Sequence, residues 1–138
     1  MILREKRSIT CPHDLTNAGL SAIAVVPVAG NFVTGGKIAE KGFSSYRKFK
    51  KAYGKAGDGM EWHHIVEQRP ANISLFGAER IHNIDNMIAL PTDVHKKISG
   101  HYSSKYMNTN LIVREWLNDK SFEFQYEYGK NVLKWYGY

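Results

Sequence analysis

Four polar residues of the chain, His63, His64, Asn86 and His95, have the types and spacing of a hydrolytic metal site. Five of the six histidines fall between positions 63 and 101, so the chemistry is expected there. Neighbouring residues in a strand point to opposite faces. One imidazole of the His63–His64 pair can then hold a divalent cation while the other takes a proton from water. The pattern therefore predicts metal-assisted cleavage of a phosphodiester bond.

Several basic residues outside this group of four are candidates for substrate binding. Lys96 and Lys97 follow His95 and could contact a phosphate, although a solvated helix face explains them equally well. His101 is a weaker candidate, because it faces away from His95 unless the helix breaks before it. Arg69 and Arg114 are candidate phosphate ligands on their residue type alone.

The amide of Asn86 is expected to bond to the backbone of the loop before it and so hold the strand that carries the base. The alternative is an ordinary turn asparagine. Glu61 and Glu67 flank the histidine pair and could orient an imidazole. Two imidazole ligands favour Zn²⁺, Ni²⁺ or Mn²⁺, and Mg²⁺ with several waters is also open.

The elements that position these residues follow from hydrophobic periodicity and from capping residues. Aromatic residues recur at helical spacing before Gly54 and predict a helix with an aromatic core face, capped by Ser44 or Ser45. The predicted elements are helices at 15–26 and 44–53, a strand at 60–66, a small helix near 71–77, a strand at 87–90, a helix at 94–98 capped by Thr92 or Asp93, and two helices within 111–138 broken near Lys120–Ser121.

Size and charge indicate one globular domain that could bind a polyanion. The chain has 138 residues and one cysteine, so an intrachain disulfide is excluded. The net charge of +6 lies in residues 1–60, which carry ten Lys or Arg and four Asp or Glu; residues 61–138 carry nine of each. A basic patch favours nucleic acid as partner, and a solvated helix face is the alternative.

The run from Leu15 to Gly36 is uncharged and near the length of a membrane span. Pro27 and four glycines interrupt it, so we expect a buried helix and a glycine-rich turn, with no stable membrane span in the folded domain. Residues 1–36 are interpreted as a lead-in segment before a domain at 37–138.

At these residues the chain resembles the HNH, or ββα-metal finger, nuclease superfamily, and in particular the AHH/WHH-type nuclease toxins that end bacterial polymorphic toxins. The matching stretches are Trp62–Gln68, Ile81–Asn86, Leu90–Pro91 with His95, Ile98–Lys105 and Val113–Leu117. The chain departs from the family at two positions: Glu67 stands where a proline is frequent, and Ser99 where a further histidine is frequent.

The resemblance implies an α+β fold in which a ββα-metal finger, two short strands and a helix, is embedded in further helices. It makes His63 and His95 ligands of one divalent metal ion (Mg²⁺, Mn²⁺, Zn²⁺ or Ni²⁺), His64 the general base and Asn86 the structural asparagine. It also implies an endonuclease toxin that cleaves DNA or RNA.

The segment Val25–Asn31 is similar to the apolar pre-toxin stretch of such proteins. The resemblance then implies a secreted effector domain that acts in the cytoplasm of a target bacterium. It further implies neutralisation by a cognate immunity protein, often acidic.

Two other functions fit parts of the sequence. A nucleic-acid-binding module without catalysis would need only the basic residues between 37 and 55. A structural zinc domain is a weaker fit, because such sites are usually four-coordinate and rich in cysteine, and Cys11 is remote from the histidines.

Overall fold

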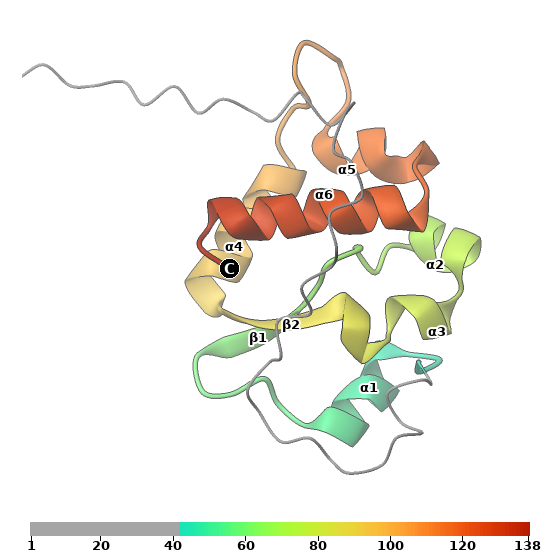
Figure 1. Ribbon diagram of the computed structural model, residues 1–138, viewed down its shortest axis with the longest axis vertical. Helices are drawn as coiled ribbons and strands as arrows, with labels where there is room; N and C mark the ends of the chain where they lie inside the picture. The colour runs from blue at the N-terminus through green and yellow to red at the C-terminus, as the bar shows by residue number, and fades with distance from the viewer. Residues whose placement is uncertain (1–41) are drawn as a thin grey trace, which may run out of the picture. The chain divides into compact units, whose positions relative to one another are not determined.

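Residues 42–138 are described by the computed structural model and have an α+β fold, as the sequence predicts (Figure 1). The expected helix at 15–26, the lead-in at 1–36 and its boundary lie outside the described residues. In chain order the elements are α1 (Tyr46–Tyr53), β1 (Met60–His64), α2 (Pro70–Phe76), α3 (Ala78–Ile81), the 3₁₀ turn η1 (Ile84–Asn86), β2 (Met87–Pro91), α4 (Thr92–Tyr102), α5 (Val113–Trp116), the 3₁₀ turn η2 (Leu117–Asp119) and α6 (Phe122–Trp135).

The two strands form an antiparallel sheet in which His63 pairs with Ile88 and His64 with Met87. Strand alternation sends the two histidines to different helices. The ring of His63 lies 5.3 Å from that of His95 on α4. Trp62, on the same strand face as His64, packs edge-on against α1. The alternation expected for the histidine pair is therefore present in the sheet.

Helix α1 forms where its aromatic spacing and caps predict it. The Ser45 side chain accepts a hydrogen bond from the backbone N–H of Lys48, which satisfies one free donor of the first turn. Gly54 ends the helix with φ 78°, a conformation that costs glycine little. Phe49 is fully buried against the rings of Tyr53 and Trp62. The aromatic face is thus core packing.

Helix α4 differs from the prediction at both ends. Strand β2 passes directly into α4 through Pro91, so Thr92 and Asp93 are already helical and neither caps the helix. The Thr92 hydroxyl instead donates to the carbonyl oxygen of Gly59. The helix also continues to Tyr102, because a helical glycine costs only about 1 kcal/mol and the buried Ile98 and Tyr102 bracket Gly100.

The C-terminal part contains two helical segments separated at residues 120–121, as predicted, but the first is one α-turn followed by the 3₁₀ turn η2. Ser121 caps α6 by accepting from the backbone N–H of Phe124. Gly129 of α6 lies directly against Ile65, the residue after β1, so α6 supports the strand that carries the histidine pair. Within residues 42–138, no helix has the length and hydrophobicity of a membrane span.

Candidate functional site

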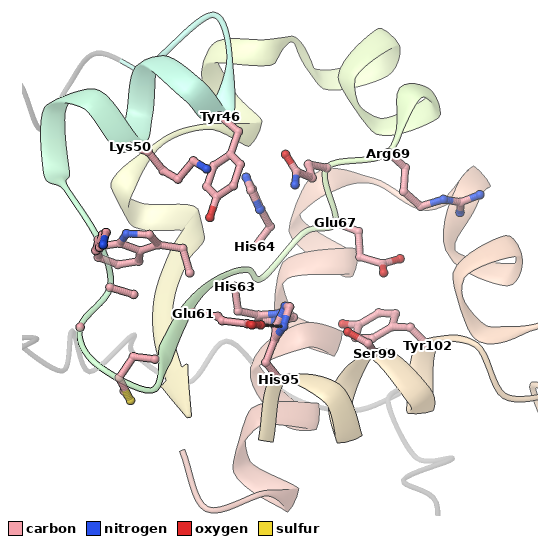
Figure 2. Close-up of a pocket in the computed structure, with 16 residues that line it drawn as sticks. Tyr46, Lys50, Glu61, His63, His64, Glu67, Arg69, His95, Ser99 and Tyr102 are labelled. Atoms are coloured by element: carbon pink, nitrogen blue, oxygen red, sulfur yellow. Dashed lines mark ion pairs between the residues drawn. The ribbon is translucent and has the colours of Figure 1, made fainter. Parts of the chain in front are cut away.

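A pocket of about 510 Å³ contains three of the four residues that the sequence singles out (Figure 2). His63 and His64 enter it from β1, and His95 enters it from α4. Its lining combines imidazoles, carboxylates, aromatic rings and cations; the other members of these classes are Glu61, Glu67, Tyr46, Trp62, Tyr102, Lys50, Lys55 and Arg69. A cavity with this mixture can bind a charged, partly aromatic ligand.

His63 and His95 lie together with Glu61 at one end of the pocket. The Nδ1 atom of His95 lies 2.5 Å from a carboxylate oxygen of Glu61, as the dashed line in Figure 2 marks. The Nε2 atom of His63 is buried and has no hydrogen-bond partner. Burial and, to a smaller extent, the neighbouring His95 lower the pKa of His63 to about 4, so the ring is neutral near pH 7. A neutral imidazole is the form that binds a metal.

His64 points away from this end, toward α1 and His82. Its Nε2 atom lies 3.1 Å from Nδ1 of His82, and its ring packs edge-on against Tyr46 with centroids 5.1 Å apart. Burial and, to a smaller extent, the neighbouring histidines lower the pKa of His64 to about 3. The ring is therefore neutral and carries a lone pair on one nitrogen at neutral pH.

Asn86 is fully buried outside the pocket and bonds to two backbone segments. Its Oδ1 accepts from the N–H of Val66 at 2.8 Å, and its Nδ2 donates to the carbonyls of Val66 and Ile81 at 3.0 and 2.9 Å. The amide joins the chain just after His64 to the chain just before His82. This is the loop-holding geometry expected of Asn86.

Two of the three cations at the pocket were not among the phosphate ligands expected from the sequence: Lys50 on α1 and Lys55 in the following loop. The third, Arg69, was a candidate, and its guanidinium donates to the Arg114 carbonyl and to Oδ1 of Asn118. Lys96 and Lys97 are exposed on α4 and do not line the pocket, and Lys97 pairs with Asp93 at 3.6 Å.

His101 and Arg114, two further candidates for substrate binding, do not line the pocket. Nε2 of His101 is 2.8 Å from the hydroxyl of Tyr128 on α6, because α4 continues without a break and turns this residue toward the C-terminal helix. The guanidinium of Arg114 donates to the Glu67 carboxylate at 3.0 Å. Burial raises the pKa of Glu67, and the charge of Arg114 opposes that shift. The pair joins the end of the β1 segment to α5.

His63 and His95 can each offer one imidazole nitrogen as a ligand to a divalent metal ion. The unpartnered Nε2 of His63 is a free ligand atom in a buried position. The Glu61 carboxylate engages Nδ1 of His95 and leaves Nε2 for a metal, a pairing that histidine ligands commonly have. Among residues 42–138 no group of three or more His, Cys, Asp or Glu is arranged to hold a metal. Water or substrate oxygens would supply the other ligands.

His82 is not among the residues singled out from the sequence, and the fold places it against His64. A separation of 18 residues has no helical or strand period, and only the packing of the loop between β1 and β2 brings the rings together. Lys50 and Lys55 belong to a basic segment, and nothing in the sequence distinguishes them from the other cations of that segment.

Comparisons of the chain with protein-family models, curated proteins and solved structures found no significant match.

Proposed function

We propose that this chain is a metal-dependent endonuclease toxin domain of the HNH superfamily, with β1, β2 and α4 as its ββα-metal finger. The observation that carries the proposal is the division of the histidine pair. His63 meets His95 on α4, while His64 turns to α1, yet both line one pocket. That separation supports two different roles for neighbouring imidazoles in one reaction.

In the proposed reaction, His63 and His95 hold one divalent cation, either Mg²⁺, Mn²⁺, Zn²⁺ or Ni²⁺. When bound, the cation supplies positive charge that neutralises the phosphate and the leaving oxygen. His64 takes a proton from water, and the water oxygen forms a new bond to phosphorus. The bond from phosphorus to one sugar oxygen breaks, and that oxygen takes a proton from solvent. Such a base contributes on the order of 10²–10⁴-fold to the rate.

The substrate in this proposal is a nucleic acid. Lys50 and Lys55 bring positive charge to the same pocket as the histidines, and they can bind phosphates beside the one that is cleaved. Attack by activated water needs no 2′-hydroxyl, so DNA and RNA are both open as substrates. By its resemblance to polymorphic toxins, the domain is proposed to be secreted, to act in the cytoplasm of a target bacterium and to be neutralised by an immunity protein.

The test is cleavage of matched DNA and RNA by the purified protein with each of the four metals and with chelator. We expect metal-dependent cleavage that chelator stops and that His64→Ala lowers by about 10²–10⁴-fold while metal binding is kept. His63→Ala and His95→Ala should instead weaken metal binding in calorimetry. Full activity in His64→Ala would remove the base, and unchanged metal affinity in both other variants would remove the metal site.

A nucleic-acid-binding module without catalysis is the second candidate function. It is favoured by the cations of α1. Salt-dependent binding to nucleic acid, with no cleavage by the folded protein under any metal, would select this function over the first.

A further inference from the structure

We propose that His82 is the residue that orients His64 and fixes its tautomer for proton abstraction, a positioning role that rests on the proposed nuclease function. His82 does not line the pocket. It lies behind His64, at the end of α3, and acts on the reaction only through the His64 ring.

The contact between the two imidazoles is buried and well defined. His64 Nε2 and His82 Nδ1 are 3.1 Å apart, and the ring planes are inclined by 74°. Only 6% of His64 and 4% of His82 is exposed. Tyr46 packs edge-on against the first ring and stacks on the second at 6.4 Å. The neighbouring helix therefore limits the rotation of both rings.

A hydrogen bond between two neutral imidazoles has one donor and one acceptor, so it selects a tautomer. If His64 donates its Nε2–H to Nδ1 of His82, the lone pair of His64 is on Nδ1, where it can accept a proton. The reverse bond would place the proton on Nδ1 of His64 and occupy the Nε2 lone pair, which leaves no base. The catalytic arrangement therefore requires Nδ1 of His82 to be the acceptor.

Proton abstraction leaves this hydrogen bond intact. When Nδ1 of His64 takes the proton of water, the ring becomes an imidazolium whose Nε2–H still donates to His82. The acceptor is then bonded to a charged donor, and such bonds are stronger than neutral ones. His82 thus keeps its hydrogen bond to His64 through the step without exchanging a proton itself.

The backbone holds His82 at the required place. Its N–H donates to the carbonyl of Ala78 at 2.8 Å, and its own carbonyl accepts from Phe43 at 3.1 Å. Asn86 bonds to Ile81, next to His82, and to Val66, two residues after His64. One buried amide therefore spans the two backbone segments that carry the imidazole pair.

Two substitutions test the role. His82→Asn keeps a side-chain amide near the position of Nδ1, and His82→Leu fills the space without a polar atom. We expect His82→Leu to lower kcat by about ten- to a hundredfold with KM changed less than about threefold, as for other residues that orient a site ligand. His82→Asn should recover most of kcat. Tyr126→Phe, which removes a hydrogen bond from α6 to the carbonyl of Asp85, is the control and should keep kcat.

A second measurement tests the contact between His64 and His82 independently of cleavage activity. Imidazole ¹⁵N chemical shifts of the metal-free protein near pH 7 should show His64 protonated on Nε2 in the unmodified chain and a mixture of tautomers in His82→Leu. A His64 ring protonated on Nδ1 would overturn the proposal. A folded His82→Leu with kcat within twofold of the unmodified chain would also overturn it and leave the nuclease standing. Unmodified protein that cleaves neither DNA nor RNA would overturn both.

Discussion

Asn86 fixes the local geometry of the pocket although it does not line it. Its side chain makes three buried hydrogen bonds to backbone atoms of two segments. These bonds explain the asparagine without any ligand. One side-chain amide has the acceptor and the donors that match one unpaired backbone N–H and two unpaired backbone carbonyls.

We therefore expect Asn86→Ala to lower the free energy of unfolding by about 3 kcal/mol or more, because it leaves the N–H of Val66 and two carbonyls unpaired in the interior. Urea denaturation measures this. Asn83→Ala is the matched control: Asn83 only caps η1 by accepting from the N–H of Asp85, and its loss should cost about 1 kcal/mol. Equal losses in the two variants would contradict the role assigned to Asn86.

The buried histidines make the stability of the metal-free protein depend on pH. Folding lowers the pKa of His63 to about 4 and that of His64 to about 3, against about 6.5 in an unfolded chain. At pH values between the folded and the unfolded pKa, the unfolded chain binds more protons than the folded one. The free energy of unfolding that these rings contribute above about pH 6.5 is therefore lost as the pH falls. At about pH 5 the loss per histidine is roughly 2 kcal/mol.

Urea unfolding in chelator at about pH 7.5 and pH 5 measures this loss, and the double variant His63→Gln/His64→Gln should remove much of it. Stability that stays constant or rises toward pH 5 would show that the two rings are not buried as neutral groups.

At the scale of elements, β1 is held in place by contacts from helices distant in the sequence. Helix α4 packs on both strands. Gly129 brings α6 so close to Ile65 that a Cβ on the glycine would lie 2.5 Å from the Ile65 carbonyl oxygen. The end of the histidine strand thus depends on a helix that begins more than fifty residues later.

Gly129→Ala should lower the free energy of unfolding by about 1–3 kcal/mol, because the methyl group can be accommodated only by a shift of backbone. The variant should also lower cleavage, since Ile65 follows His64 directly. Gly100→Ala is the control within α4: nothing lies within 4 Å of its added Cβ, so it should raise stability by about 0.5–1 kcal/mol. Thermal or urea unfolding compares them, and equal effects would exclude the close approach of α6 to Ile65.

At the scale of the whole molecule, the position of charge relative to the pocket matters more than the net charge of +6. The excess cations lie before residue 61, and α1 with its following loop brings Lys50 and Lys55 to the pocket that contains the histidines. Phosphate contacts made there should release counterions on binding.

Nucleic-acid binding by Lys50→Ala/Lys55→Ala should therefore show a smaller salt dependence, with the slope of log K against log salt reduced by about 2. The control is Lys105→Ala/Lys134→Ala, which removes two exposed cations outside the pocket and should leave the slope nearly unchanged. Fluorescence anisotropy over a salt series measures both. Equal reductions would show that binding responds to total charge and not to the pocket.

Local patterns determined most of the elements. The aromatic period and its flanking Ser45 and Gly54 define α1, a short apolar run defines β2, and Ser121 marks the start of α6. These features depend on residues within a few positions of one another, so the sequence alone predicts them. The opposite orientations of His63 and His64 follow from strand geometry in the same way.

Only the tertiary structure decided which side chains share the pocket. The contact of His64 with His82, the turn of His101 toward Tyr128 and the selection of Lys50 over Lys96 depend on how distant segments pack. Packing brings together residues whose separation in the chain follows no helical or strand period. The burial and the contacts of each side chain depend on its three-dimensional surroundings, which a local pattern does not contain.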